Sequence, residues 1–140
     1  MVIVDSSVWI EAARRQGDLA CKVALESLLE EYEAAVCSPV RLEVLGGARK
    51  EERSGLAAGF AVIPYIGVTE STWNLALDNA WRLRDARLQA PWNDLLIACV
   101  SIEHGCRVYA RDKLFELMAQ AIGVRLYQPG YGGSFAPDLR

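Results

Sequence analysis

The sequence predicts an α/β domain with a central, mostly parallel β-sheet. Short runs rich in β-branched and other apolar residues alternate along the chain with longer segments of helical periodicity, the pattern of repeated β-α-β units. The 140 residues fit a single domain, and 52% of them are hydrophobic against 24% charged, as in an ordinary globular protein. We therefore expect one folded unit with a full hydrophobic core.

The expected strands and helices follow one another in that alternating order. Each strand is a short apolar run, and the strands fall at residues 2–4, 34–37, 60–64, 107–110 and 124–127. Each helix repeats apolar residues every three or four positions, and the helices fall at residues 7–15, 18–32, 40–49, 52–59, 69–87, 93–104 and 113–122.

Residues that cap or stop helices support several of these boundaries. Ser38 is expected to cap a helix whose first residue is Pro39, and Gly105 after His104 is expected to stop another. Residues 128–140 are rich in glycine and have no periodicity, so we expect a flexible C-terminal tail after a folded domain at 1–127.

The cysteines and the apolar runs predict a soluble cytoplasmic protein. The four cysteines form no C-x-x-C pair, which favours reduced thiols in a reducing compartment. The N-terminus shows no basic leader or cleavage site, and no apolar run reaches the roughly 18 residues that span a bilayer. We expect no membrane segment.

Four acidic residues are the candidates for chemistry. Asp5 directly follows the first expected strand, Asp112 follows the fourth, and Glu43 lies in the helix after the second. Ligands of parallel sheets collect beyond the carboxyl ends of the strands, so these side chains are expected to be neighbours. Asp94 begins the helix that runs back across the sheet.

Each of these acids also has a purely structural explanation. Asp5, Asp94 and Asp112 could cap helices or occupy their first turns, which stabilises a helix by about 1 kcal/mol. Glu43 has no capping task and apolar neighbours in sequence, although a solvent-facing side chain would need no further explanation. The joint placement of the four acids is what favours a site.

Clustered carboxylates repel one another and stay ionised only around cations, and an all-oxygen ligand set selects magnesium or manganese. Such ions activate water for attack on phosphodiesters. The net charge of -3 argues weakly against binding nucleic acid by charge alone, but much of that charge would be neutralised at the metal site.

The sequence lacks the residues that other catalytic mechanisms need. His104 is the only histidine and is expected at a helix end, which excludes a histidine-pair ribonuclease. The chain also contains no G-x-S-x-G elbow, no zinc-type ligand set, no P-loop and no G-x-G-x-x-G. Ser7 stands where a strand-end D-x-D phosphatase would have its second acid.

Four segments in order resemble a known family. They are VIVDSSVWI at 2–10, PVRLEVL at 39–45, NDLLIA at 93–98 and ARDKLF at 110–115. Together they resemble PIN-domain ribonucleases of the VapC toxin type over nearly the whole chain. The resemblance implies a three-layer α/β/α PIN-like fold and cleavage of RNA at a Mg²⁺ or Mn²⁺ site.

The same resemblance implies roles for individual residues. Asp5, Glu43, Asp94 and Asp112 match the four metal-binding acids, and Ser6 matches a position that helps to arrange the site, although it could be a plain helix cap. The family commonly has Thr or Ser two residues before the last acid, whereas this chain has Ala110, so an orienting hydroxyl is missing.

The substrate and protein partners are less defined. Arg111 is a candidate for a phosphate contact and Trp92 for base stacking, whereas a second group is expected to pack as one helix face: Trp73, Leu77, Ala80 and Arg84. The resemblance implies a cognate antitoxin and a homodimer. A housekeeping RNA-processing nuclease or a weakly active binding scaffold remains an alternative.

A groove for the antitoxin is expected on the helices at 18–32 and 40–49. These helices carry more leucines than one core face needs, although the leucines could simply complete the core: Leu25, Leu28, Leu29, Leu42 and Leu45.

Overall fold

The computed structural model describes residues 1–130 and contains a sheet of four parallel strands. The strands lie in the order β3 (Tyr65–Ile66), β2 (Ala34–Cys37), β1 (Val2–Val4) and β4 (Arg107–Tyr109), and every pairing is parallel. The two central strands are fully buried, as expected for strands covered on both faces. The prediction of a mainly parallel sheet is confirmed.

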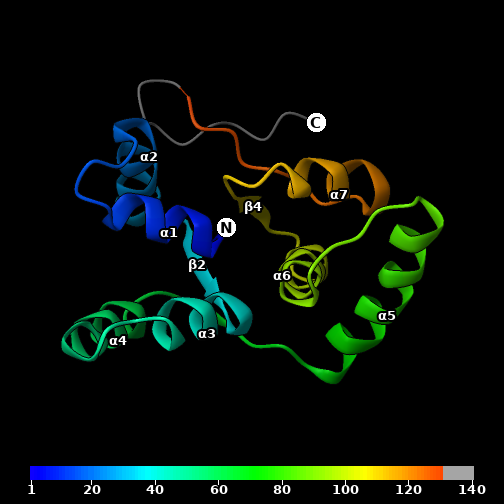
Figure 1. The fold of residues 1–140 in the computed structure, drawn as a ribbon, viewed down its shortest axis with the longest axis horizontal. Coiled ribbons are helices and arrows are strands. Elements are labelled where there is room, and N and C mark those ends of the chain that lie inside the picture. The colour runs from blue at the N-terminus through cyan, green and yellow to red at the C-terminus, as the bar shows by residue number, and fades with distance from the viewer. Residues whose placement is uncertain (131–140) are drawn as a thin grey trace.

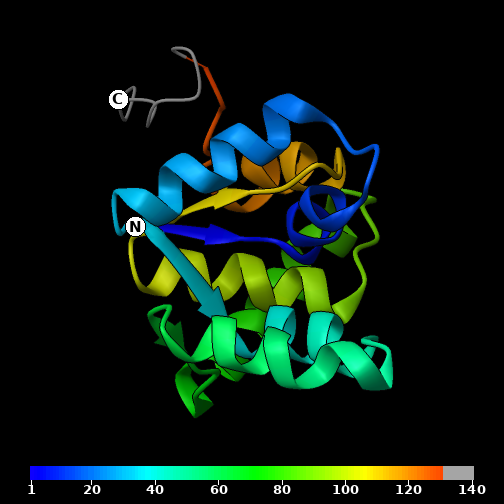
Figure 2. The ribbon, with the colours of Figure 1, turned by 90° about the vertical axis from the view of Figure 1, so that its left-hand side faces the viewer.

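Helices cover both faces of this sheet. Val2 and Val4 face α1 (Ser6–Ala13) and α2 (Leu19–Glu30), whereas Ile3 faces the opposite core around α6 (Trp92–Glu103). The view along the sheet shows β1 between α2 and α6 (Figure 2). The chain therefore forms the three expected layers.

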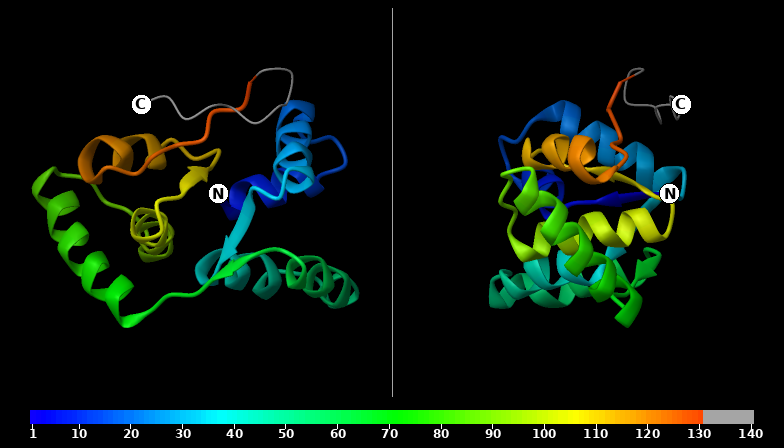
Figure 3. Two further views of the ribbon diagram at one scale, coloured as in Figure 1. Left: turned by 180° about the vertical axis from the view of Figure 1, so that it is seen from behind. Right: turned by 90° about the vertical axis from the view of Figure 1, so that its right-hand side faces the viewer.

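The remaining helices extend the layer around α6. After α3 (Ser38–Gly46), the short turn η1 (Lys50–Glu52) leads into α4 (Arg53–Ala61). At the other end of the molecule, α5 (Glu70–Asp85) packs on α6 and α7 (Leu114–Ile122), which lie between it and the sheet (Figures 1 and 3). Seven residues of α6 are buried, so this helix is the centre of the larger core.

Two strand predictions were wrong. The apolar run at 60–64 begins with the last turn of α4, because Phe60 packs edge-on against Trp9 with ring centroids 5.0 Å apart, and the strand follows at Tyr65–Ile66. The run at 124–127 forms only one bridge, between Val108 and Leu126.

The helix boundaries agree to within a few residues, with one change of role. Ser38 is the first residue of α3, and instead of capping it the hydroxyl accepts the backbone N–H of Val68 at 3.1 Å. This bond holds the segment after β3 against the start of α3. Gly105, with φ of 63°, follows α6 as expected, since glycine tolerates this left-handed conformation.

Burial corrects the prediction for α5. Trp73 and Leu77, expected to pack, are 54% and 52% exposed, because the buried face of this helix is formed by Thr72, Ala76, Asn79 and Leu83. The four cysteines are buried and free. Within residues 1–130, no helix combines the length and apolarity needed to cross a membrane.

Candidate metal centre

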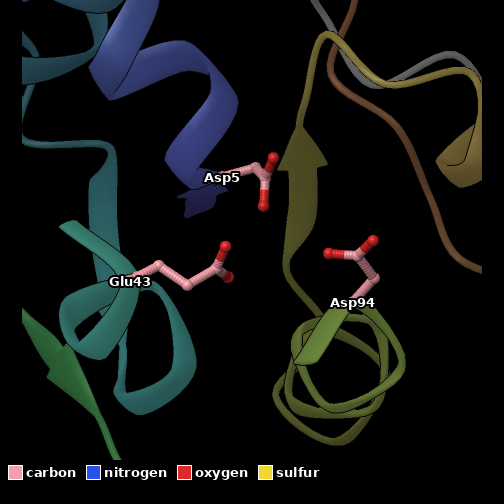
Figure 4. Close-up of side chains that lie close together, drawn as sticks. All are labelled: Asp5, Glu43 and Asp94. Carbon is pink, nitrogen blue, oxygen red and sulfur yellow. The ribbon is translucent and has the colours of Figure 1, made fainter. Parts of the chain in front are cut away.

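Three of the four predicted acids meet at one edge of the sheet. One carboxylate oxygen from each of Asp5, Glu43 and Asp94 lies within 4.8 Å of the other two. The side chains come from three separate elements and point toward one another (Figure 4). We call this group the acid cluster.

The topology explains why residues so distant in sequence meet. Asp5 follows β1 and Glu43 lies in α3, which begins where β2 ends, so both acids stand at the carboxyl edge of neighbouring parallel strands. Asp94 lies in the first turn of α6, and this helix packs against α3. A site at this edge is the usual arrangement for open parallel sheets.

Asp5 uses its two oxygens differently. Oδ2 accepts hydrogen bonds from the backbone N–H of Ser7 at 3.1 Å and from the Ser7 hydroxyl at 2.6 Å, so Asp5 caps α1. Oδ1 is buried and has no hydrogen-bond partner in the described part of the chain. An unpaired buried carboxylate oxygen is costly, and a bound cation removes that cost.

Glu43 is oriented by Ser6. The Ser6 hydroxyl donates to Glu43 Oε2 at 3.1 Å, which supports the orienting role expected for this serine. Glu43 itself is exposed, so the apolar environment inferred from its neighbours in sequence was wrong. Val40 is buried but Leu42 is 68% exposed, because the two lie on different sides of α3.

Among the three acids of the cluster, Asp94 has a clearly shifted pKa. Partial burial, followed by the negative charges of Asp5, Glu43 and Asp112, raises its pKa from an ordinary 3.8 to about 6. These causes all penalise the ionised form. The cluster is therefore short of positive charge near neutral pH.

Asp112 lies outside the three-acid group, although its charge still acts on the pKa of Asp94. Its Oδ1 accepts the backbone N–H of Leu114 at 3.0 Å, at the start of α7. Both explanations offered for this residue therefore have a structural basis: it caps a helix, and it lies close enough to add negative charge at the cluster.

The two candidate RNA-binding residues differ in whether the side chain already has a partner within the described residues. The Arg111 guanidinium pairs with Asp18 at 2.9 Å, and this bond raises the already high pKa of Arg111. Trp92, two residues before Asp94, is 72% exposed. Trp92 is free to meet a ligand, whereas Arg111 must exchange a partner to do so.

Ser7 was missed as a site residue. Its hydroxyl donates to Asp5 Oδ2 and accepts the backbone N–H of Arg111 at 3.0 Å, which ties the loop before Asp112 to α1. A serine two residues after a strand-end aspartate can form this local turn, and that was the available signal. The bond supplies an orienting hydroxyl at Asp5 in a chain that has Ala110.

His104 is remote from the cluster. It follows the last residue of α6, whereas Asp94 lies in the first turn of the same helix. Ten residues of helix separate the two by about 15 Å. Histidine therefore has no direct part in chemistry at the acid cluster.

Comparison with known proteins identifies the class that this fold and site define. Residues 2–121 match the family described as PIN domain. The crystal structure of FitAcB from Neisseria gonorrhoeae superimposes with a TM-score of 0.76 at 17% identity, covering 92% of this chain and 98% of that one. A toxin-antitoxin complex from Klebsiella pneumoniae gives a TM-score of 0.69 at 16% identity, over 93% and 98%.

A curated relative narrows the assignment. Ribonuclease VapC11 of Mycobacterium tuberculosis is 31% identical over 125 residues, which cover 86% of this chain and 92% of the relative. The chain therefore belongs to the PIN-domain family, in the group of the VapC ribonucleases.

Proposed function

We propose that this chain is a divalent-metal-dependent endoribonuclease, the toxin of a toxin-antitoxin pair, and that its catalytic acids are Asp5, Glu43, Asp94 and Asp112. Membership of the VapC ribonucleases supports the reaction. The single observation that carries the site is the unpaired, buried Oδ1 of Asp5 beside two further carboxylates. An oxygen ligand set of this kind suits Mg²⁺, with Mn²⁺ as a substitute.

The residues of the chain prepare the site for such an ion. The Ser7 hydroxyl donates to Asp5 Oδ2, which leaves Oδ1 outside this hydrogen bond, and the Ser6 hydroxyl donates to Glu43 Oε2. When bound, a divalent cation supplies charge compensation for the acids and Lewis-acid activation of water and phosphodiester. Asp94 gives up its proton most readily when positive charge enters the site, because its raised pKa results partly from the other acids.

Substrate contacts are assigned beside the cluster. We assign base stacking to Trp92, whose exposed ring lies near Asp94 in the chain. We assign a phosphate contact to Arg111, which would exchange Asp18 for the RNA backbone. Neither contact selects a particular RNA sequence.

The direct test is RNA cleavage by the purified chain. We expect cleavage with Mg²⁺ or Mn²⁺, none in EDTA, and losses of orders of magnitude in Asp5→Asn, Glu43→Gln, Asp94→Asn and Asp112→Asn. His104→Ala is the matched control, and its rate should equal that of the parent. Cleavage in EDTA, or a large loss in His104→Ala with folding intact, would refute the metal mechanism.

The antitoxin is expected to bind an apolar groove between α2 and α4. Leu25 and Leu28, predicted to line a groove on α2 and α3, belong to the core. A groove with a volume of about 510 Å³ is lined by residues of α1, α2, β2 and α4 and of the segments that follow α2 and α4: Trp9, Leu29, Tyr32, Ala34, Gly55, Leu56, Gly59, Phe60, Val62, Ile63 and Pro64.

Two glycines make this groove suitable for a helix. Gly55 and Gly59 are one turn apart on α4, and a Cβ added at either would meet no atom within 4 Å. Small residues at this spacing let a second helix approach closely, and an amphipathic helix in an apolar groove is a common mode of recognition.

Co-expression with the product of the adjacent gene tests this partner. We expect co-purification and loss of cleavage, both reversed by Gly59→Leu, with the exposed Leu19→Glu on α2 as a control that retains binding. If the two proteins neither associate nor affect cleavage, the toxin assignment fails and a housekeeping nuclease takes its place.

A further inference from the structure

A cavity of about 270 Å³ lies between the start of α2 and the loop that carries Asp112. Asp18, Ala20 and Cys21 form one wall, residues 110–113 between β4 and α7 form the second, and residues 126–129 form the third. We call it the Asp18 cavity. Pockets for small ligands begin at about 300 Å³, so this space suits one planar group such as a nucleobase and is too small for a protein helix.

The Asp18 cavity adjoins the acid cluster. Asp112 lines the cavity, and its negative charge also raises the pKa of Asp94 in the cluster. Arg111, the next lining residue, donates its backbone N–H to the Ser7 hydroxyl, which in turn donates to Asp5. A group bound in the cavity therefore lies beside the proposed cleavage site.

The lining combines aromatic rings with exposed cations. Tyr109 and Tyr127 are 4% and 2% exposed and meet edge to face with ring centroids 5.1 Å apart. The lining residues Arg111 and Lys113 are exposed. Aromatic side chains favour contact with bases, and Arg and Lys favour contact with phosphates. The cavity therefore offers partners to both parts of a nucleotide.

An ion pair joins two walls of the cavity. Arg111 Nη1 donates to Asp18 Oδ2 at 2.9 Å, while Asp18 Oδ1 accepts the backbone N–H of Ala20 at 3.0 Å. The other acids of the lining are Asp112, assigned to the metal centre, and Glu116. An exposed ion pair stabilises little, so a phosphate can replace Asp18 on Arg111 while Oδ1 still caps α2.

We propose that the Asp18 cavity receives the base of one RNA nucleotide next to the cleaved bond, and that Asp18 competes with the phosphate of this nucleotide for Arg111. This inference rests on the proposed function, because it takes RNA as the substrate. Asp18 is then a residue that weakens RNA binding, and the shape of the cavity acts on the base rather than on the phosphate.

Binding of a short fluorescent single-stranded RNA to Asp94→Asn in Mg²⁺ tests the competition. Asp94→Asn is expected to be inactive, so the RNA stays intact while fluorescence anisotropy gives the Kd. Adding Asp18→Asn should lower the Kd about two- to fivefold, because asparagine keeps the helix cap and releases Arg111. Asp78→Asn removes the same charge from the exposed surface of α5 and should leave the Kd nearly unchanged.

Arg111→Ala tests which cation gains from the release. It should raise the Kd about tenfold and lower the slope of log Kd against log salt concentration by about 0.7, the value for one phosphate contact of a single strand. In this background Asp18→Asn should lose most of its effect. An equal gain with and without Arg111 would overturn the competition.

Filling the cavity tests the base. Ala20→Phe should raise the Kd for RNA at least about fivefold and leave the Kd for an abasic ribose-phosphate oligomer of the same length unchanged, because only RNA loses a base contact. Ala58→Phe, at an exposed alanine of α4, is the matched control and should change neither. Circular dichroism verifies that each variant is folded.

Two results would overturn the assignment of the base. They are an Ala20→Phe variant that binds RNA like the parent, and one that loses RNA and the abasic oligomer equally. Cleavage by the parent is scored separately on gels. A parent that binds with this pattern but cuts no RNA refutes the nuclease and leaves the cavity assignment intact, whereas a parent that cuts RNA with no effect of these variants refutes the cavity alone.

Discussion

At the scale of residues, Asp5 shows that a helix cap and a metal ligand are compatible roles. Its Oδ2 caps α1 through Ser7, while Oδ1 is buried and has no hydrogen-bond partner within residues 1–130. The side chain as a whole points toward Glu43 and Asp94 (Figure 4). A carboxylate has more acceptor sites than one cap uses. The two explanations weighed for Asp5 in the sequence therefore describe two atoms of one group.

The raised pKa of Asp94 predicts a pH-dependent stability of the metal-free protein. The groups facing it are Asp5, Glu43 and Asp112, all acidic, and its folded pKa of about 6 lies above the ordinary 3.8. The folded state thus binds the proton more tightly, so its stability falls as pH rises from about 4 to about 6. Asp94→Asn removes this loss.

Thermal melts in EDTA measure that effect. At pH 7.5 we expect Asp94→Asn to raise the Tm by a few degrees, whereas at pH 4 the two proteins should melt alike. Asp78→Asn on the exposed surface of α5 is the control and should change neither. A stabilisation that is equal at both pH values would mean that the substitution acts by packing rather than charge.

Ser7 is predicted to position Asp5. Ser7→Ala removes the 2.6 Å bond to Oδ2, so we expect Mn²⁺ affinity by calorimetry to fall about 10- to 100-fold. Ser7→Thr keeps the hydroxyl and should restore most of the affinity. If the alanine variant binds Mn²⁺ like the parent, Asp5 is held by its backbone alone.

At the scale of elements, a glycine inside a helix and a glycine after a helix end have opposite effects on stability. Gly59 lies inside α4, whereas Gly123 follows α7 with φ of 82°, and an added Cβ meets no atom within 4 Å at either site. Only backbone conformation distinguishes the two. Alanine suits the helix interior better than glycine, but it is strained in the left-handed region.

This contrast predicts opposite signs for two matched substitutions. Gly59→Ala should raise the free energy of unfolding by up to about 1 kcal/mol, and Gly123→Ala should lower it by about 1 kcal/mol. Urea denaturation of both variants gives the values. If the free energy of unfolding changes in the same direction in both variants, packing rather than backbone conformation determines the effect at one of the two positions.

At the scale of the whole molecule, the acid cluster brings together carboxylates from three elements, and these carboxylates repel one another. Asp5, Glu43 and Asp94 belong to the segment after β1, to α3 and to α6, so a cation held by these residues would join the three elements. A ligand that binds only the folded state stabilises it, by about 2.7 kcal/mol at 100 times its Kd.

Metal binding is therefore predicted to raise the melting temperature. Saturating Mg²⁺ or Mn²⁺ should increase the Tm of the parent by several degrees, and EDTA should abolish the increase. The same ions should leave the Tm of Asp5→Asn nearly unchanged, because that variant lacks the negative charge of the Asp5 carboxylate. An equal increase in parent and variant would place the ion elsewhere on the protein.

The sequence by itself determined the α/β class, the parallel sheet and the acids. Alternating strand and helix periodicity is local information, and the position of Asp5 after a strand follows from it. Strand β3 was misplaced because the apolar run from Phe60 could serve a helix equally well, and only its contact with Trp9 decided between the two.

The tertiary structure alone decided which atoms meet and which faces remain exposed. The unpaired oxygen of Asp5, the hydrogen bond from the backbone N–H of Arg111 to the Ser7 hydroxyl, and the exposure of Trp73 depend on the packing of elements distant in sequence. Helical spacing identifies one side of α5, but it does not say whether a neighbour covers that side. Burial is a property of the assembled layers, and no single segment contains it.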